Sequence, residues 1–466
     1  MKPIQLTNAQ ARDVETLVHP YTNLHLHKQT GPQMLERGEG IYVFDESGQR
    51  FIEGMSGLWC AGLGYNNAEL IDAATEQMHK LPYYHLFGGK SFEPAVALAE
   101  KLKELFATAS PDLPMARVFF ASSGSEANDT QVKLAWYFNN AHNRPKKKRI
   151  ISRVKGYHGV TIVSASLTGL PNNHRDFDLP VDGVMHAPTP HYWRGAEAGE
   201  SEEAFVIRMA EELDAMIQRE DPDTIAAMIA EPVMGAGGVI IPPTSYFPAI
   251  QAVLDRYDIR LIDDEVICGF GRTGEWFGAG TLGMRPHSAS FAKQMTSAYV
   301  PLSAVAIDSA MEEALDAQSE KIGIFGHGFT YGGHPVGCAV ALKAIEIYER
   351  MDVCTRVRRL APAFAAALQR HAEHPLVGEA RSIGLVGALE LAPDKSGKTV
   401  FNPPMKVGPK LMQEMLARGV IVRAIGDTLA FCPPMIIEED EIDALFEPLG
   451  PALDATYAWA KAEGYL

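Results

Sequence analysis

From about residue 115 to residue 310, the chain alternates short β-rich runs with segments of helical periodicity. This alternation is typical of a mainly parallel sheet whose faces are covered by helices. One helical run, from Ser245 to Asp258, places four apolar side chains on a single face: Phe247, Ile250, Val253 and Leu254. The sequence therefore predicts an α/β fold.

Five candidate strands in this region each run into a polar or aromatic group. The strands are Val118 to Ala121, Arg149 to Val154, Ala226 to Ala230, Arg260 to Asp263 and Ser288 to Ala292. The groups that follow them are Ser123-Gly124-Ser125, Gly156-Tyr157-His158, Glu231-Pro232, Asp264-Glu265 and Lys293. Because open α/β sheets bind ligands at the carboxyl ends of their strands, we expect these groups to form one site.

Asp264 and Lys293 stand at the ends of two consecutive candidate strands. An aldehyde cofactor with a pyridine ring needs an amine to form a Schiff base and a carboxylate to keep its ring nitrogen protonated. Apolar segments flank Lys293, so we expect burial to lower its pKa and to make the neutral amine available. A structural lysine whose ammonium reaches solvent is the alternative.

The segment Ser122-Ser123-Gly124-Ser125-Glu126-Ala127-Asn128 lies between a candidate strand and a helical run. A serine followed by acidic and polar residues begins many ordinary helices, but small residues there also leave backbone N–H groups free to hold a phosphate. Tyr157 and Val266 are either packing residues or covers for the two faces of a planar ring on Asp264. Both pairs of alternatives stay open.

Gly269 to Gly274 matches the GxGxxG pattern of dinucleotide-binding proteins. Asp263, Asp264 and Glu265 stand just before these glycines, and their charges would repel a pyrophosphate. We therefore expect a glycine-rich turn that shapes a cleft.

The formal net charge of −16 over 466 residues repels polyanions, so we expect no nucleic-acid partner. The one basic run, Lys146-Lys147-Lys148-Arg149, is expected to be a solvated loop. Five scattered cysteines without CxxC spacing indicate reduced thiols and a cytoplasmic location. No stretch reaches the roughly 18 apolar residues of a membrane helix, so we expect no membrane association.

His25 and His27 alternate with leucines near the N-terminus and have no acidic or cysteine neighbour in the sequence. Histidines in this setting are more often packing or capping groups than metal ligands, so we expect no metal site.

From about His334 the pattern changes to a long helical run and then to mixed α and β segments. We predict three parts: an N-terminal segment of a small domain (1–67), a large cofactor domain (68–335) and a C-terminal small domain (336–466).

The ordered set of these motifs resembles the class III pyridoxal-phosphate aminotransferases, and most closely their ω-amino acid or amine:pyruvate subgroup. The resemblance extends from Leu58-Trp59-Cys60 to Arg423. It implies the fold type I of pyridoxal-phosphate enzymes, with a mainly parallel seven-stranded sheet in the large domain and a smaller α+β domain. It also implies a homodimer with shared active sites, and small amines and keto acids as substrates.

The same resemblance implies individual roles. Lys293 corresponds to the Schiff-base lysine and proton shuttle, Asp264 to the partner of the pyridine nitrogen, and Glu231 to the acid behind the cofactor. The other cofactor contacts are Ser123, Gly124 and Ser125 at the phosphate, Tyr157 and Val266 at the ring, His158, and Thr330 from the neighbouring subunit. The implied substrate pocket consists of Trp59, Phe87, Tyr157, Phe329 and Arg423.

One departure bears on the substrate. Class III members that act on ornithine, acetylornithine or γ-aminobutyrate typically carry Gln-Gly-Glu after Glu-Pro, and that glutamate pairs with a mobile arginine. This chain has Met234-Gly235-Ala236 instead. Arg423 matches the flexible arginine of the amine:pyruvate subgroup, which binds a carboxylate or swings aside for an apolar donor. A surface arginine at a strand end is the alternative.

The expected function is transfer of an amino group from an ω-amino acid or primary amine to pyruvate, by a ping-pong mechanism on pyridoxal 5'-phosphate. The alternatives are a class III aminomutase, a dialkylglycine-type decarboxylating aminotransferase, and a protein that binds the cofactor without catalysis. The sequence leaves the natural donor open.

Overall fold

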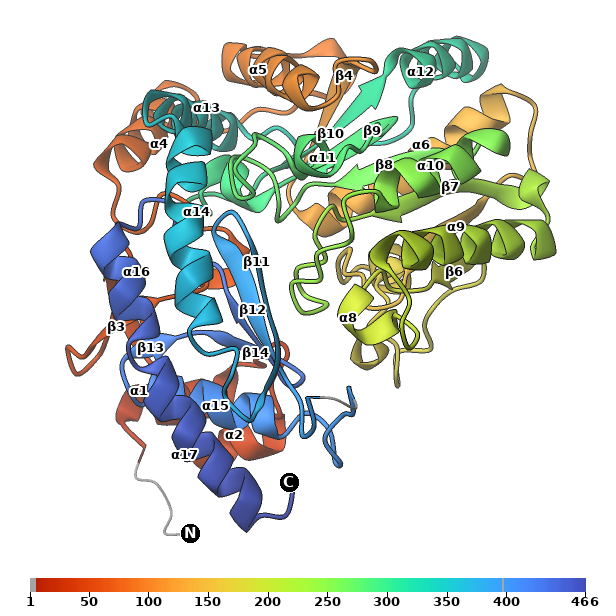
Figure 1. Ribbon diagram of the computed structural model, residues 1–466. Helices are drawn as coiled ribbons and strands as arrows, with labels where there is room; N and C mark the ends of the chain where they lie inside the picture. Colours follow the sequence, from red (N-terminus) through yellow and green to blue (C-terminus); the bar gives the residue numbers. More distant parts are fainter. Residues whose placement is uncertain (1–5, 396–397) are drawn as a thin grey trace.

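The computed structural model describes residues 6–395 and 398–466, and its centre is a seven-stranded sheet (Figure 1). The strand order is β4-β10-β9-β8-β7-β5-β6. Only β10 runs antiparallel to its neighbours, so the prediction of a mainly parallel sheet is confirmed. The strands are β4 (Met115–Ala121), β5 (Arg149–Arg153), β6 (Val184–Ala187), β7 (Ile225–Ala230), β8 (Arg260–Asp264), β9 (Ser288–Phe291) and β10 (Ser303–Asp308).

The five predicted strands correspond to β4, β5, β7, β8 and β9, with end points that differ by a few residues. In the register, Ala230 lies opposite Asp263, and Asp264 lies opposite Ser290. The carboxyl ends of β7, β8 and β9 therefore meet at one edge of the sheet, where the groups that follow them come together.

Helices cover both faces of the sheet. On one face α6 packs against α7 and α12, and on the other α10 packs against α9, while α5 packs against α11 and α13. The predicted helix of residues 245–258 is α10, and its four apolar side chains are buried as expected. The bounds are α5 (Glu93–Ala109), α6 (Gly124–Ala141), α7 (Ile162–Leu167), α8 (Tyr192–Gly195), α9 (Glu202–Arg219), α10 (Tyr246–Arg256), α11 (Gly278–Leu282), α12 (Ser309–Ile322) and α13 (Pro335–Arg350).

Two four-stranded sheets lie beside the central one, in the orders β1-β2-β3-β13 and β11-β12-β15-β14. The parallel pair of β3 and β13 joins the N-terminal strands to the C-terminal part of the chain. The domain boundaries themselves stay a prediction. The strands are β1 (Leu35–Glu39), β2 (Tyr42–Asp45), β3 (Arg50–Glu53), β11 (Val377–Ile383), β12 (Val386–Leu391), β13 (Val420–Ile421), β14 (Arg423–Ile425) and β15 (Thr428–Phe431).

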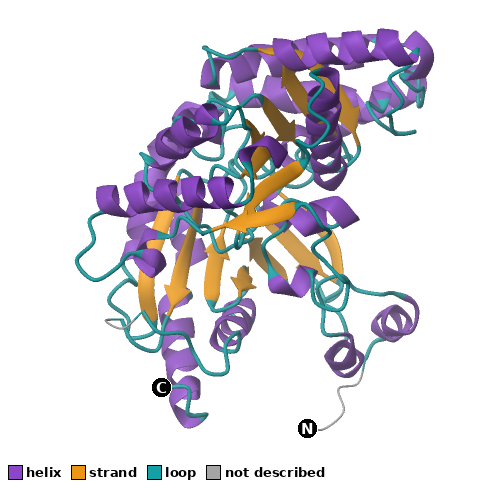
Figure 2. Ribbon diagram, turned by 90° about the vertical axis from the view of Figure 1, so that its right-hand side faces the viewer, coloured by secondary structure: helices purple, strands orange, loops and turns teal. Residues whose placement is uncertain are grey.

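The remaining helices belong to the connections and to the two ends of the chain. They are α1 (Asn8–Thr16), α2 (Leu24–Thr30), α3 (Ser56–Trp59), α4 (Ala68–Lys80), α14 (Val353–Gln369), α15 (Val407–Leu416), α16 (Glu439–Phe446) and α17 (Leu449–Ala462). The short 3₁₀ turns are η1 (Phe87–Gly89), η2 (Pro171–Asn173), η3 (Pro222–Thr224) and η4 (Lys293–Thr296). Figure 2 shows that the first helices after the N-terminal trace stand out from the body of the molecule.

Two expectations about charged and polar side chains are wrong. Lys147 does not lie in a solvated loop: it is buried, and its Nζ donates to the carbonyl of Tyr257 at 2.8 Å. His27 does have an acidic partner, because its Nε2 lies 3.1 Å from Asp13 Oδ1. The partner is distant in sequence and reaches His27 only because the chain turns back between α1 and α2.

The glycine-rich segment between β8 and α11 is a turn, as expected. Its Arg272 is fully buried and donates to the carbonyls of Leu385 and Pro433, so the turn fastens the central sheet to the C-terminal part of the chain. Within the described residues, no helix combines the length and the apolar character that a membrane crossing requires.

Candidate active site

A cavity of about 130 Å³ opens at the carboxyl edge of the central sheet. Eight predicted site residues line it: Gly124, Ser125, Tyr157, His158, Glu231, Asp264, Val266 and Lys293. They come from the ends of five strands or from the turns that follow, so the expectation of one site assembled from distant sequence is confirmed. Gly159, Ile267, Ala292 and Asn128 complete the wall.

Asp264 is the most heavily hydrogen-bonded group in this cavity. Its Oδ2 accepts from Asn128 Nδ2 at 2.7 Å and from His158 Nδ1 at 2.8 Å, and its Oδ1 accepts from the backbone N–H of Val266 at 3.1 Å. Only 3% of Asp264 is exposed. Three hydrogen bonds fix the orientation of this buried carboxyl group, which could pair with the ring nitrogen of a bound pyridine.

His158 Nδ1 is the donor to Asp264, so Nε2 is left as an acceptor. That atom is buried and has no hydrogen-bond partner within the described chain. A buried acceptor without a donor costs free energy unless a ligand supplies one. A Cβ on Gly156 would approach this Nε2 to 3.3 Å, so the nitrogen lies against the turn that follows β5.

Glu231 joins the turn after β5 to the loop after β7. Its Oε1 accepts from the backbone N–H of Tyr157 at 2.9 Å, and its Oε2 accepts from the backbone N–H of Gly235 at 3.0 Å. Burial raises the pKa of Glu231. Through its bond to the backbone of Tyr157, the carboxyl group fixes the turn that carries this aromatic side chain to the cavity wall.

Lys293 begins η4 directly after β9 and has a backbone φ of 49°, a left-handed value that side chains seldom adopt. Strain of this kind is held in place by surrounding structure and clusters at functional sites. Burial lowers the pKa of Lys293, and the nearby acidic groups Cys60, Asp264 and Glu231 only partly oppose the effect. The expectation of a desolvated amine is thus supported.

The N-terminus of α6 forms the floor of the cavity. Ser123 caps the helix by accepting from the N–H of Glu126 at 3.2 Å, so the capping interpretation holds. A Cβ on Gly124 would approach Val266 Cγ1 and Cγ2 to 3.2 Å, and one on Gly159 would approach Ser125 Oγ to 2.4 Å. Only glycine at these two positions leaves space beside the start of α6. The free N–H groups of the first turn stand at the positive end of this 18-residue helix.

A second cavity, of about 620 Å³, shares Tyr157 with the first. Arg423, at the start of β14, lines it together with Ala236 and Tyr21. Arg423 forms no ion pair with a carboxylate in residues 6–395 or 398–466. A guanidinium without a protein counter-ion, lining a cavity that has an alanine at position 236, suits an external carboxylate.

Five predicted residues line neither cavity: Ser123, which caps α6, and four others. Trp59 lies buried in the core with only 2% exposure, although its neighbour Cys60 is close enough to Lys293 to influence its pKa. Phe87, Phe329 and Thr330 lie together on an exposed face, where a Cβ on Gly328 would meet Phe87 Cζ at 2.8 Å. Their place in the site therefore stays a prediction.

Two residues that the sequence did not reveal belong to the site. Asn128 follows Ser125 by about one turn of α6, and this spacing was the signal that could have placed it beside Asp264. Tyr21 gave no signal, because it comes from the N-terminal segment. Its hydroxyl accepts from Asn173 Nδ2 at 2.6 Å, and after burial it is the next largest cause of the raised pKa of Tyr157.

The family model described as Aminotransferase class-III matches residues 26–453 of this chain. The chain belongs to this family. A curated relative, gamma aminobutyrate transaminase 1 (mitochondrial) of Solanum lycopersicum, is 46% identical over 440 residues, which cover 94% of this chain and 85% of that protein. Fold type I and the resemblance to class III aminotransferases are confirmed.

Solved structures agree. The ω transaminase from Pseudomonas jessenii in complex with PMP superposes with a TM-score of 0.95 and 48% identity, covering 97% of this chain and 99% of that one. A transaminase with L-Ala gives a TM-score of 0.88 and 51% identity, covering 91% and 99%. Class III aminotransferases use pyridoxal phosphate, so this chain is a pyridoxal-phosphate-dependent aminotransferase.

The observed cavity fits this cofactor. The glycine positions at the start of α6, the hydrogen-bonded Asp264 and the desolvated Lys293 are the features that a phosphorylated pyridine aldehyde requires.

Proposed function

We propose that this aminotransferase moves an amino group from an ω-amino acid or primary amine to pyruvate. The observation that carries the proposal is the adjacency of two cavities: one holds Lys293 and Asp264, and the other is lined by Arg423 without a protein counter-ion. The shared wall residue, Tyr157, places the carboxylate-binding group next to the chemical centre.

Pyridoxal phosphate, when bound, supplies an aldehyde and a pyridine ring that accepts electron density. Asp264 keeps the ring nitrogen protonated, and Asn128 and His158 hold its carboxylate in place. Ser123, Gly124 and Ser125 offer the phosphate the N-terminus of α6.

Lys293 has two tasks in this proposal. Its Nζ would hold the aldehyde of the bound cofactor. When a substrate amine takes that place, Nζ would move a proton away from the carbon that bears the amino group, and burial, which lowers the pKa of Lys293, favours the neutral amine that this task needs. Tyr157 and Val266 cover the ring on the cavity walls and limit the access of water.

Arg423 distinguishes the two half-reactions. A keto acid brings a carboxylate, which the guanidinium binds in a charge-assisted pair. An amine donor with an apolar substituent needs the same space, which the flexible arginine vacates. The cavity of about 620 Å³ is large enough for both arrangements.

The donor is best sought among ω-amino compounds. The curated relatives are named gamma aminobutyrate transaminases, and the similar structures include ω transaminases. The absence of a glutamate at position 236 thus does not remove γ-aminobutyrate from the candidates. The relative solved with L-Ala supports the alanine and pyruvate couple.

The test is a panel of γ-aminobutyrate, β-alanine, putrescine and an aryl alkyl amine, each offered with pyruvate and with 2-oxoglutarate. The proposal predicts alanine from pyruvate and little glutamate from 2-oxoglutarate. Glutamate without alanine would contradict the acceptor, and an isomerised or decarboxylated donor without alanine would favour the aminomutase or decarboxylating alternatives.

We also propose a homodimer with shared sites. Phe87 is 49% exposed and Tyr331 is 64% exposed, on the same face as Thr330, whose carbonyl accepts from Tyr83 Oη at 2.8 Å. Aromatic side chains left on a surface are typical of an interface. A second copy would cover them and would bring Thr330 to the phosphate of the neighbouring site.

Mixed dimers test this arrangement. A dimer of one Lys293→Ala chain and one Thr330→Ala chain contains one intact site if Thr330 acts across the interface. It then shows half the wild-type activity with wild-type cofactor affinity. If Thr330 acts within its own chain, the single Lys293 site has weakened cofactor affinity, and the proposal fails.

A reducing, cytoplasmic location is supported by five free thiols, of which four are buried. The curated relatives carry mitochondrial or chloroplastic names, so cell fractionation decides the compartment.

A further inference from the structure

The segment that contains α1 and α2 has almost no apolar core of its own. No residue of α1 is buried, and His27 is the only buried residue of α2. Leu17, Val18 and Leu24 are exposed instead. A small unit of this kind needs another source of stability, such as a metal ion.

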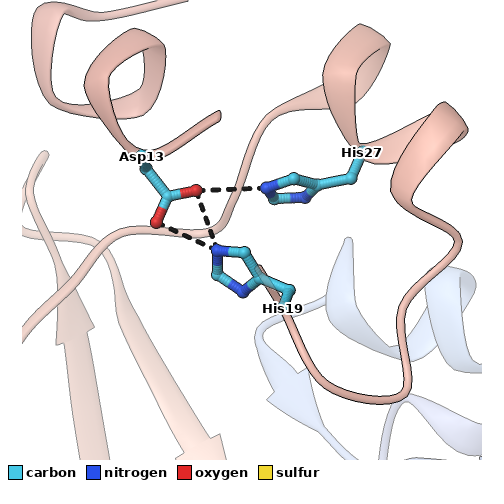
Figure 3. A group of neighbouring side chains, drawn as sticks. All are labelled: Asp13, His19 and His27. Atoms are coloured by element: carbon cyan, nitrogen blue, oxygen red, sulfur yellow. Dashed lines mark hydrogen bonds and ion pairs between the residues drawn. The ribbon is translucent and has the colours of Figure 1, made fainter. Parts of the chain in front are cut away.

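Three side chains converge at the centre of this segment (Figure 3). Asp13 comes from α1, His19 from the loop that follows, and His27 from α2. His19 Nε2 lies 2.9 Å from Asp13 Oδ1 and 3.0 Å from Oδ2, and His27 Nε2 lies 3.1 Å from Oδ1. The centroids of the two imidazole rings are 4.3 Å apart, and the Nε2 atom of each ring faces the same carboxylate.

These separations suit a common ion. Zinc binds imidazole nitrogen at about 2.0–2.1 Å and carboxylate oxygen at about 2.0–2.2 Å, so tetrahedral ligand atoms stand about 3.3 Å apart. The three ligand atoms all lie within 4.8 Å of one another. Small outward movements would admit an ion between them, and two histidines with one carboxylate form a common zinc-ligand set.

We propose that Asp13, His19 and His27 bind one Zn²⁺ ion per chain, with a fourth position open to water. Asp13 forms its ion pairs in the described residues only with these two histidines, so no lysine or arginine competes for its oxygens. His27 is 8% exposed, which shields the ion, while the partly exposed His19 gives it an entry path.

A second histidine and carboxylate cluster lacks this freedom. His191, Glu379 and Glu390 also lie within ligand distance of one another. Both carboxylates are already paired with Arg381, at 2.5 and 2.7 Å. A cation there would have to displace a guanidinium, so this cluster is not a metal site.

The ion would fix a loop that reaches the larger cavity. Tyr21 lies between His19 and His27 in the sequence. Its side chain lines the larger cavity, and its hydroxyl accepts a hydrogen bond from Asn173. Binding Zn²⁺ at both ends of this loop would hold Tyr21 in place. The metal site itself does not depend on the proposed substrate.

The experiment measures Zn²⁺ bound to tag-free, cofactor-loaded protein by equilibrium dialysis, alongside limited proteolysis of the N-terminal segment. The wild type should bind one Zn²⁺ per chain and should become protected from cleavage near residues 13–27. His19→Ala and Asp13→Asn should lose both effects. Asp13→Asn preserves the shape of the side chain and guards against simple misfolding.

His25→Ala is the matched control, because His25 lies on the same helix and contacts only Gln29 in the hydrogen bonds of the described chain. It should bind Zn²⁺ as the wild type does. Absence of bound Zn²⁺ in the wild type, or its retention in both Asp13→Asn and His19→Ala, would overturn the proposal. In that case the three groups form an ordinary hydrogen-bonded cluster.

Discussion

The edge of the central sheet and the face that carries Phe87, Phe329 and Thr330 are built in opposite ways. At the sheet edge, Asp264 and Glu231 are 3% exposed and are held by hydrogen bonds from elements far apart in the sequence. On the other face, Phe87 and Thr330 are exposed, and the ring of Phe329 contacts Phe119 of β4. One chain thus assembles its proposed chemical centre alone, whereas the exposed aromatic face is where the proposed second copy would pack.

The largest effect is expected at the sheet edge. Lys293→Ala removes both the attachment point of the cofactor and the proton carrier, so the amine half-reaction should slow by about 10⁴-fold. Single-turnover absorbance measurements would record the loss. Added methylamine should restore part of the rate, because it replaces the missing amine; a variant that cycles normally would show that Lys293 is not the reacting group.

Asp264→Asn should reduce kcat by roughly 10²- to 10³-fold, because the ring nitrogen loses its charged partner. Asp263→Asn on the same strand is the control. Burial and the neighbouring Glu265 raise the pKa of Asp263 well above its usual value, so its neutral carboxyl resembles an amide. Equal losses of kcat in the two variants would mean that altered packing at the end of β8, rather than the loss of a contact with the cofactor, lowers the activity.

The substrate side should respond through KM. Arg423→Ala should raise KM for pyruvate about 10- to 100-fold, because a charge-assisted pair is lost, with little change for an aromatic amine. Ala236→Glu should have a similar effect by occupying Arg423 from within the cavity, and Ala236→Gln should not. Equal shifts for keto acid and amine would remove the carboxylate role of Arg423.

The last expected effect concerns stability rather than activity, at the end of β3. Glu53 accepts hydrogen bonds from Gly57 N–H and from Tyr65 Oη, and burial raises its pKa to about 7 from 4.5. The folded state therefore binds a proton that the unfolded state lacks between these values. This contribution is complete below pH 4.5 and is lost as the pH rises through about 7.

The Glu53→Gln variant should remove this pH dependence. Relative to the wild type, its free energy of unfolding should rise by roughly 3 kcal/mol across that interval. Urea unfolding at several pH values measures the difference. Parallel pH profiles for the two proteins would show that Glu53 titrates normally.

The sequence predicted the sheet edge well because both of its signals are local. Each apolar strand is followed directly by its functional residue, and parallel strands bring those residues together without further information. Asn128 could have been predicted in the same way, because it follows Ser125 by about one turn of α6. The family resemblance added the roles of these residues.

The substrate side could not be predicted in the same way. Tyr21 reaches Asn173 through a turn of the N-terminal segment that no periodicity encodes. Two residues outside the site show the same limit. His27 meets Asp13 through that segment, and Lys147 is buried against Tyr257, which lies far along the chain. Such long-range contacts depend on tertiary packing rather than on local patterns. Trp59 is 2% exposed in the single chain and lines neither cavity there, so its place in the substrate pocket stays a prediction.

The attachment of the cofactor to Lys293 is tested most directly by borohydride reduction of the holoenzyme, followed by proteolysis and mass spectrometry. The structure predicts a phosphopyridoxyl group on the peptide that contains Lys293 and on no other lysine peptide. A label on a different lysine, or none at all after loading with pyridoxal phosphate, would contradict it.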